Sequence, residues 1–316
     1  MNRKLSLAGL VDAAAFTGVW MTLAACLGSL DWALEIFTHV TPQLALCFFG
    51  YGLYRLVIAR RHRYGIWIAA GAFALGAVNA AFVAPRLTPP PRFDAPVRQR
   101  FRVLQSNVLT GNRDATRLLK LIETEAPDVI LLQETDEDWL RRLSPLTNRY
   151  PVAASEARTD NFGAAVFAKT GKADILHFSD AERSPCARVV IPTASGPVTF
   201  LGIHPLAPGD REDWKGRDAL LGEIARFAAG KPRFVIMGDF NTTPYTHAYH
   251  AFERESGLLD ANLGRLPFPT WHAVYPFFLR IPLDHCFHSR DLRADDLRRG
   301  PSIGSDHFPL MFDFSL

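Results

Sequence analysis

The chain has 316 residues, 48% of them apolar, and it carries 35 Lys and Arg against 32 Asp and Glu, a formal charge of +3. The excess lies near the amino terminus, because residues 1–85 hold six basic and three acidic residues and residues 86–316 are neutral overall. This balance excludes a globally basic protein that binds nucleic acid through charge alone, although a local basic groove stays open.

Three long apolar runs fill most of residues 1–85; they cover residues 13–30, 40–59 and 64–84. Each approaches the 20 or so residues that cross a bilayer. Their one charge, Arg55, lies near the end of the second run, where a long side chain reaches the interface. A cleaved signal peptide explains the first run only, and a buried helical hairpin of a soluble protein is the other alternative. We therefore expect an anchor of about three transmembrane helices.

Basic residues in the short loops predict the orientation of this anchor. Arg3 and Lys4 precede the first run, and the tetrad RRHR at residues 60–63 separates the second and third. The loop between the first two runs has Asp31 and Glu35 and no basic residue. The positive-inside rule then places the amino terminus in the cytoplasm. Three crossings predict a multi-pass protein of the inner (plasma) membrane with its remaining domain on the extracytoplasmic side.

Residues 86–100 are rich in proline, which favours a stiff, extended spacer without a core. We thus predict three parts: an anchor at 1–85, a linker at 86–100 and a domain at 101–316. In that domain, helical spacing marks residues 114–125 and 217–229. Short apolar runs predict strands at residues 101–107, 127–135, 162–169, 174–178, 187–192, 198–204, 233–241, 281–289 and 309–316. Strands mixed with a few helices favour an α/β domain whose sheets pack face to face.

Polar side chains follow many of the predicted strands, where they would emerge at the edge of a sheet; they are Asn107, Glu134, His204, Asp239, Asn241, Asp284 and Ser305–Asp306–His307. A hard cation such as Mg²⁺ prefers oxygen ligands, a role that suits Glu134 and Asp306. Asp239 and Asn241 would share one face of an extended segment, so that one acts on a water and the other holds phosphate.

His307 is a candidate donor to a phosphate oxygen, and a carboxylate such as Asp284 would fix its ring and favour its charged form. Taken singly, each of these residues is more often a turn, cap or structural residue. Their combination and order favour the hydrolysis of a phosphate ester.

Six strings, in the same order, resemble motifs of the endonuclease/exonuclease/phosphatase superfamily, which has the DNase I-like fold. They are QSNV at 105–108, PDVILLQET at 127–135, GIHP at 202–205, VIMGDFNTTP at 235–244, PLDHCF at 282–287 and GSDHFPLMFDF at 304–314. The resemblance implies a two-sheet α/β sandwich flanked by helices, with the site at one edge. The plan of the whole chain resembles bacterial membrane-anchored members.

The resemblance also implies a metal site. By motif position Glu134 resembles the main metal ligand, supported by Asn107 and Asp306. The implied cofactor is Mg²⁺, with Mn²⁺ as a substitute; one metal or two stays open.

The remaining motif residues resemble the catalytic groups of the superfamily. Asp239 would activate or orient the nucleophile and Asn241 would contact phosphate. His307, paired with Asp284, and His204 would stabilise charge or donate a proton at the scissile phosphate. For His204 the sequence offers only a guess at a carboxylate partner, Asp160.

One residue departs from the pattern of the superfamily and makes one of its activities less favoured. Leu109 stands two residues after Asn107, where abasic-site endonucleases have an acid. Abasic-site repair is therefore disfavoured, and the predicted export topology disfavours it too. A nucleic-acid partner stays possible but is not favoured. The chain is also short for DNA-gripping insertions.

The leading hypothesis is a membrane-anchored phosphodiesterase or phosphatase that acts on a lipid or another envelope phosphate ester. Close before Asp284 the sequence carries an aromatic stretch that either meets the bilayer or fills the sandwich edge: Phe268, Trp271, Tyr275, Phe277 and Phe278. The alternatives are an anchored extracellular Mg²⁺-dependent nuclease and a non-catalytic binder of a phosphorylated ligand. Cys186 and Cys286 are either buried free thiols or a disulfide in an oxidising compartment.

Overall fold

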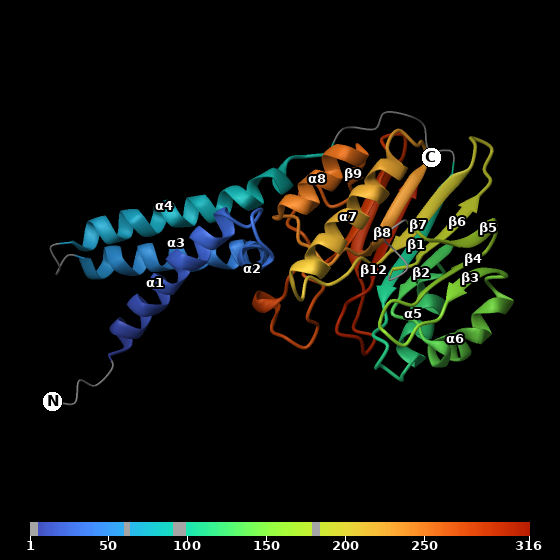
Figure 1. Ribbon diagram of the computed structural model, residues 1–316, viewed down its shortest axis with the longest axis horizontal. Coiled ribbons are helices and arrows are strands. Elements are labelled where there is room, and N and C mark those ends of the chain that lie inside the picture. Colours follow the sequence, from blue (N-terminus) through green and yellow to red (C-terminus); the bar gives the residue numbers. More distant parts are fainter. Residues whose placement is uncertain (1–5, 60–63, 91–98, 179–183) are drawn as a thin grey trace. The chain divides into compact units, whose positions relative to one another are not determined.

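The computed structural model describes residues 6–59, 64–90, 99–178 and 184–316. The chain forms two compact units. The first, which we call the helical unit, holds Met1–Thr88 and Pro244–His247, and the second, the sandwich unit, holds Pro89–Thr243 and Ala248–Leu316. Figure 1 shows the helices of the first in blue and the strands of the second from green to red. The domain limits given above at residues 85 and 100 stay a prediction.

The helical unit consists mainly of long apolar helices; its elements are α1 (Leu7–Cys26), α2 (Trp32–Glu35), η1 (Ile36–Val40), α3 (Thr41–Ala59), α4 (Gly65–Val83) and η2 (Ala84–Leu87). Ser6 caps α1, because its Oγ accepts a hydrogen bond from the Gly9 N–H at 3.1 Å. A buried hydrogen bond from Asn79 Nδ2 to Thr22 Oγ1, 2.8 Å long, joins α4 to α1.

Two helices of this unit, among the described residues, are long and apolar enough to cross a membrane: Leu7–Cys26 and Gly65–Leu87. The expectation of about three spans is therefore supported for two of the three apolar runs. The middle run does form a helix, α3, but Gln43, Tyr51 and Arg55 lower its hydropathy. The boundaries also differ, since the first helix begins at Leu7 and not at residue 13.

Several features used to predict topology lie outside the described residues: Arg3 and Lys4, the RRHR loop and residues 91–98 of the linker. At the start of the linker the expectation of an extended chain is wrong. Residues 84–87 form the 3-10 turn η2, in which Pro85 occupies an early position that needs no N–H donor.

The sandwich unit consists of two six-stranded sheets. The first has the strand order β11–β12–β1–β2–β4–β3, and the second has the order β5–β6–β7–β8–β10–β9. The strands are β1 (Arg100–Asn107), β2 (Val129–Gln133), β3 (Val152–Glu156), β4 (Ala164–Ala168), β5 (Lys172–Leu176), β6 (Cys186–Ile191), β7 (Val198–Ile203), β8 (Phe234–Asp239), β9 (Leu259–Asp260), β10 (Asp284–His288), β11 (Arg293–Arg299) and β12 (Leu310–Ser315). A two-sheet α/β sandwich is the predicted fold.

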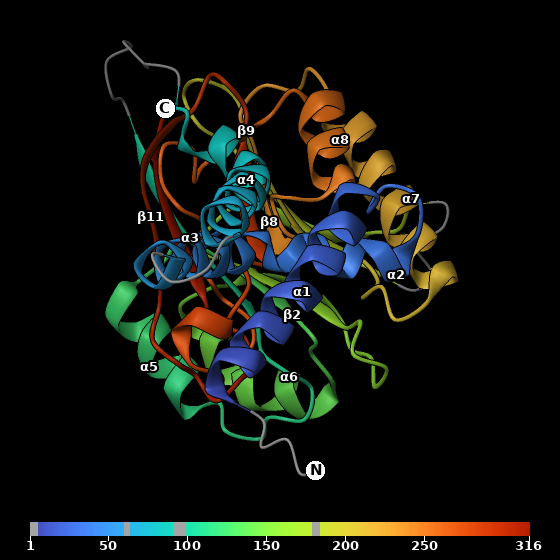
Figure 2. The ribbon, with the colours of Figure 1, turned by 90° about the vertical axis from the view of Figure 1, so that its left-hand side faces the viewer.

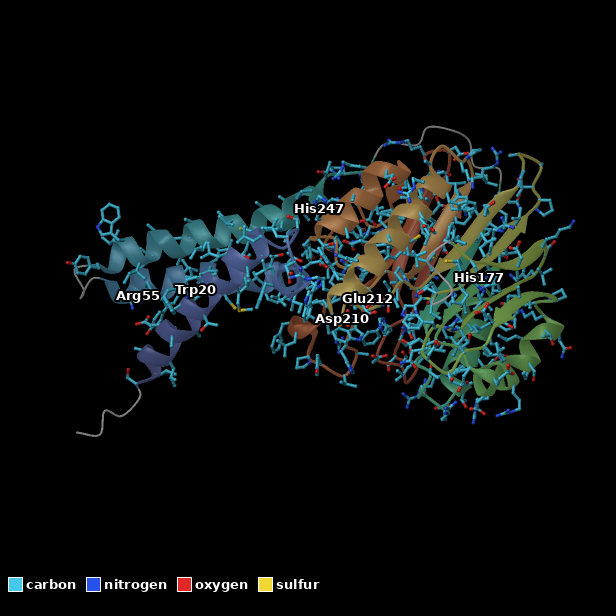
Figure 3. All side chains as sticks on the ribbon, in the orientation of Figure 1. Trp20, Arg55, His177, Asp210, Glu212 and His247 are labelled. Atoms are coloured by element: carbon cyan, nitrogen blue, oxygen red, sulfur yellow. The ribbon has the colours of Figure 1, made fainter. Side chains whose placement is uncertain are left out.

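Helices cover the outer faces of both sheets (Figure 2). Leu118 and Ile122 of α5 (Thr116–Glu125) and Trp139 of α6 (Glu137–Leu143) pack on the first sheet, beside the turn η3 (Ser144–Asn148). The other pair, α7 (Arg211–Ala228) and α8 (His247–Ser256), packs on the second sheet. Figure 3 labels Asp210 at the start of α7, where its Oδ1 accepts the Glu212 N–H at 2.8 Å and caps the helix.

The main core lies between the two sheets, where alternate residues of the inner strands face each other. Val103 and Leu131 of the first sheet pack against Phe200 and Met237 of the second. The two cysteines of this unit are free and buried: Cys286 belongs to this inner core, whereas Cys186 faces the helices on the outside. The free-thiol alternative therefore describes this structure.

Candidate active site

The predicted site residues come together because of the direction of the strands. β1 runs parallel to β2, and β7 runs parallel to β8, so these four strands end at one edge of the sandwich. β10 is antiparallel to β8 and begins at Asp284, directly opposite Asp239. Asn107 and Asp239 are the last residues of β1 and β8, while Glu134 and His204 follow the ends of β2 and β7.

Glu134 is a buried carboxylate held by uncharged donors. Asn107 Nδ2 donates to its Oε1 at 2.8 Å, and the Thr110 N–H donates to its Oε2 at 3.2 Å. In the described part of the chain no Lys, Arg or His nitrogen lies within 4 Å of this carboxylate. A buried negative charge without a partner is unfavourable, so the position favours a cation.

Three residues at this edge have left-handed backbone conformations: Leu109 (φ 61°), Glu134 (φ 62°) and Asn241 (φ 48°). Such conformations cost free energy in non-glycine residues and cluster at functional sites. They also correct one premise of the sequence analysis, since the chain turns at Asn241 and is not extended from Asp239 onward. The Asn241 N–H donates to Asp239 Oδ1 at 2.9 Å, and Asn241 Nδ2 donates to the Pro205 carbonyl at 2.9 Å.

Asp239 lies between two histidines. Its Oδ2 is 3.5 Å from His204 Nε2 and 3.4 Å from His307 Nε2. Burial alone would raise the pKa of Asp239, but the two imidazoles and the Asn241 N–H outweigh burial and hold this pKa well below its usual range. The carboxylate is therefore charged and accepts hydrogen bonds.

His307 is fixed by a second carboxylate. Its Nδ1 is 2.8 Å from Asp284 Oδ2, and the other oxygen of Asp284 accepts a hydrogen bond from Gln105 Nε2 at 2.9 Å. Burial alone lowers the pKa of His307, whereas Asp284 and Asp239 raise it, and the net result is a pKa of about 10. The predicted pairing of His307 with Asp284 is thus a contact in the structure.

His204 has surroundings that the sequence did not indicate. Asp160, the guessed partner, pairs with Arg158 Nη2 at 2.6 Å, so that guess was wrong. The His204 ring lies beside Phe162 at a centroid distance of 5.4 Å, and its Nδ1 has no hydrogen-bond partner among the described residues. Burial opposes the charged ring, but Asp239 and then Glu134 outweigh burial and raise the pKa of His204.

Asp306 reaches the same edge from the loop before β12. Trp271 Nε1 donates to Asp306 Oδ2 at 3.1 Å, and Ser305 Oγ donates to the Asn107 carbonyl at 2.8 Å, which ties this loop to β1. Sequence reasoning missed Gln105, Thr110 and Trp271 as neighbours of the site. Gln105 and Trp271 each lie within or close to a singled-out string, but a lone Gln or Trp carries no signal for this role.

A divalent cation fits these residues by chemistry. Glu134 and Asp306 supply two carboxylates, which are hard donors that Mg²⁺ prefers. Asn107 also has an amide oxygen; it accepts the Leu109 N–H at 3.0 Å and keeps a second lone pair. Neither carboxylate forms an ion pair within the described residues. The described residues contain no cluster of three or more His, Cys, Asp or Glu side chains that could hold a metal ion, so the remaining ligands of a cation here would be water and substrate.

Comparisons with known proteins agree with this geometry. No curated protein sequence matches the chain. Three similar solved structures are an endonuclease/exonuclease/phosphatase from Beutenbergia cavernae, D. rerio TDP2 complexed with single-strand DNA product, and the human Nocturnin catalytic domain with a bound sulfate anion. The first is 20% identical with a TM-score of 0.54 and covers 69% of this chain and 72% of its own.

D. rerio TDP2 is 15% identical with a TM-score of 0.54, covering 69% of this chain and 100% of its own. Nocturnin is 20% identical with a TM-score of 0.50, covering 68% of this chain and 94% of its own. These likenesses establish the DNase I-like fold. The sequence model of the Endonuclease/Exonuclease/phosphatase family matches residues 104–307, which span all the site residues described above. The chain belongs to the Endonuclease/Exonuclease/phosphatase family.

Proposed function

We propose that the protein is a membrane-anchored, Mg²⁺-dependent phosphoesterase that hydrolyses a phosphate ester of a lipid or another envelope component. Members of its family are typically phosphoester hydrolases and generally use divalent metal ions. The observation that carries the proposal is the pair of buried carboxylates at one edge. Glu134 has no cationic partner among the residues that the structure describes, and Asp239 stands between two imidazoles.

Each side chain of the site has a separate role in hydrolysis. Glu134, Asn107 and Asp306 would hold a cation, which would supply positive charge toward the phosphate oxygens. Asp239, charged and held by the Asn241 N–H, orients the attacking water by accepting a hydrogen bond from it. His307, held through Nδ1 by Asp284, presents Nε2 as a donor toward the charge that develops on the phosphoryl oxygens, and His204 does so from β7. Asn241 contributes its amide to the phosphate.

Membrane anchoring is supported by the exposure of the apolar helices. In the most apolar windows of α1 and α4, 11% and 22% of the residues are buried inside the protein. A core helix of a soluble protein would be mostly buried. The side chains of these helices thus require an apolar environment, and a bilayer supplies one.

A lipid or envelope substrate is favoured over nucleic acid by charge. Residues 86–316 are neutral overall, whereas tight binding of a phosphate backbone requires several uncompensated Lys and Arg. The alternative of an anchored nuclease has one point in its favour, the solved D. rerio TDP2 complex with single-strand DNA product, which shares the fold.

The test is a substrate panel with the full-length protein in detergent at neutral pH. The panel holds bis-p-nitrophenyl phosphate, plasmid DNA, phospholipids and polyprenyl pyrophosphate, each with Mg²⁺ and with EDTA, beside Glu134→Ala. We expect turnover that needs the metal, favours a lipid and is lost in the variant. Plasmid cleavage as the fastest reaction would favour the nuclease. No turnover, with a cellular phenotype that survives Glu134→Ala, would favour a non-catalytic binder.

A further inference from the structure

The sandwich unit exposes its large apolar side chains in one place. Among the residues that the structure describes in this unit, every such side chain lies in a stretch of fourteen residues; they are Leu266, Val274, Tyr275, Phe277, Phe278 and Leu279. Single exposed apolar residues are ordinary, but a concentrated patch marks an interaction surface. Phe277 and Phe278 are 65% and 67% exposed.

Some residues of the aromatic stretch fill the sandwich edge, whereas others are exposed. Phe268 packs against the core between the sheets, and Trp271 donates its indole N–H to Asp306. These two residues fill the sandwich edge. Tyr275, Phe277 and Phe278 instead project from residues 272–280, which we call the aromatic loop and which includes the turn η5 (Phe277–Leu279).

The base of the aromatic loop is fixed to the candidate active site. Trp271 and Ile281 pair on either side of the loop, with the Ile281 N–H donating to the Trp271 carbonyl at 2.6 Å. Trp271 also forms a bridge to His307, and the Ala273 N–H donates to the Asp306 carbonyl at 2.7 Å. Whatever contacts the loop therefore lies next to the site.

Two guanidinium groups lie at this base. The carbon Cζ of Arg280 is 4.8 Å and that of Arg299 is 4.3 Å from the centroid of the Phe308 ring. Arg280 also donates to the Tyr275 carbonyl at 2.7 Å, which braces the loop. Arg299 donates to the Pro269 carbonyl, and no carboxylate lies within 4 Å of it in the described residues. Adjacent cations beside exposed aromatic rings suit an anionic lipid surface.

We propose that the aromatic loop docks on the surface of an anionic phospholipid bilayer, with Phe277 and Phe278 in the interfacial region and Arg280 and Arg299 at the lipid phosphates. The proposal rests on the proposed function, because it explains how a lipid ester reaches Asp239 and His307. A bilayer is the favoured occupant since the same chain carries two helices that are long and apolar enough to cross a membrane. Aromatic and basic side chains together are typical of such contacts.

The first experiment detects contact without requiring activity. The full chain with Cys26→Ser and Cys47→Ser is placed in nanodiscs of phosphatidylcholine and phosphatidylglycerol, and a fluorophore is attached at Phe278→Cys. Ala194→Cys, an exposed position in the β6–β7 turn, is the matched control. We expect doxyl-labelled lipid to quench the label at position 278 and aqueous iodide to leave it bright, with the reverse at position 194.

Two results would overturn the proposal. Quenching at position 278 by iodide alone would place the loop in water, and protection from both quenchers would mean that protein covers it. The second experiment compares turnover of a bilayer phosphoester with that of soluble bis-p-nitrophenyl phosphate. For Phe277→Ser/Phe278→Ser we expect this ratio to fall at least about tenfold, whereas Ala194→Ser, in the exposed β6–β7 turn, leaves it unchanged. Equal loss on both substrates would contradict docking, and absence of all turnover in the wild type would contradict the proposed function while leaving the fluorescence result valid.

Discussion

Asn107 links the two sheets at the edge where the site lies, because its Nδ2 donates both to Glu134 Oε1 at 2.8 Å and to Asp239 Oδ2 at 3.3 Å. Asn107 ends β1 of the first sheet, Glu134 follows β2 of the same sheet, and Asp239 ends β8 of the second sheet. One amide therefore joins the carboxylate proposed to bind metal to the carboxylate proposed to orient water. It also keeps two negative charges together that would otherwise repel each other.

Asn107→Ala removes this link and leaves two buried carboxylates with fewer donors. We expect kcat to fall by about 100-fold or more and the Mg²⁺ concentration for half-maximal rate to rise about 10- to 100-fold. The free energy of unfolding should fall by about 1–3 kcal/mol. Metal titration of the rate and denaturant unfolding measure these quantities. Asn148→Ala, at the exposed end of η3, is the control, and wild-type kinetics in Asn107→Ala would rule out the assigned role.

Gln105 is predicted to act as a positioning residue. Its Nε2 donates to Asp284 Oδ1 at 2.9 Å and to Gln133 Oε1 at 2.8 Å, while Asp284 holds His307. Gln105→Leu keeps the size of the side chain and removes the donor, so Asp284 can rotate away from the imidazole. We expect kcat to fall about 10- to 100-fold with KM nearly unchanged. A change in KM alone would point to substrate binding.

Gly163 allows a close approach of backbone next to Glu134. A Cβ at this position would lie 1.8 Å from the carbonyl oxygen of Thr135, the residue after Glu134. Gly163→Ala must therefore shift this segment, and we expect a loss of about 1–3 kcal/mol of stability together with reduced activity. Gly111→Ala, which meets no atom within 4 Å, is the matched control. Thermal unfolding of the two variants measures this loss. Equal melting temperatures would show that the segment moves without a cost in stability.

The site could be predicted largely because its residues end apolar strands. The runs 129–132 before Glu134 and 234–237 before Asp239 are continuous apolar segments, as expected for strands that are covered on both faces. The strand before Asn107 is also largely buried, although it contains Arg102 and Gln105. Once such strands are placed in parallel, their polar ends must meet at one edge. What the sequence could not supply was contact between chain-distant side chains, such as Gln105 with Asp284 or Trp271 with Asp306.

The elements that the sequence analysis missed have weak local patterns. β11 (Arg293–Arg299) reads RADDLRR and β3 (Val152–Glu156) reads VAASE, and both lie at sheet edges, where charged and small residues are common. α8 (His247–Ser256) was missed as well, and α7 begins at Arg211, six residues before the predicted start at residue 217. Its first turn is polar, so the signal there was the Asp210 cap and not apolar spacing.

The ion pairs of Asp313 lead to a prediction of how the free energy of unfolding depends on pH. Burial alone raises its pKa, but hydrogen bonds from Arg102 (2.7 Å) and Arg298 (3.1 Å) outweigh burial and hold it below its usual range. A depressed carboxyl pKa stabilises the fold above the unfolded pKa of about 4, and this stabilisation is lost as the pH falls through the folded pKa. Asp313→Asn should thus be less stable than wild type at pH 7, with the gap closing toward pH 3.

Urea unfolding at several pH values between 3 and 7 measures this gap. Asp296→Asn is the control, because its carboxylate is half exposed and bonds to Arg298 at 3.0 Å at the rim of the same cluster. A gap for Asp313→Asn that stays constant across this range would show that the carboxyl titrates alike in the folded and unfolded chain.

We predict three crossings and not two, and the directions of the helices in the helical unit are compatible with this prediction. Asp12 near the start of α1 pairs with Arg55 near the end of α3 at 3.0 Å, so these two helices are antiparallel. Thr22 near the end of α1 accepts a hydrogen bond from Asn79 near the end of α4, so α1 and α4 are parallel. An up-down-up order of this kind is what three successive spans produce, and pairing Arg55 with Asp12 lowers the cost of placing α3 in lipid.

The number of crossings decides the side of the membrane on which the sandwich unit works. With the amino terminus in the cytoplasm, three crossings place this unit outside, whereas two crossings would return it to the cytoplasm. We expect a carboxyl-terminal alkaline phosphatase fusion to be active and a carboxyl-terminal green fluorescent protein fusion made through the general export route to be dark, since the first reporter needs an oxidising compartment and the second does not fold there. Arg55→Leu removes the ion pair of Asp12 and leaves it only the hydrogen bond from the Tyr51 hydroxyl at 2.7 Å. This variant should keep the orientation but lower the amount of protein in the membrane, because an acid without a cationic partner in a span is costly. A fluorescent fusion with inactive phosphatase would mean that α3 does not cross, and the substrate would then have to be sought among cytoplasmic phosphate esters or in the inner leaflet.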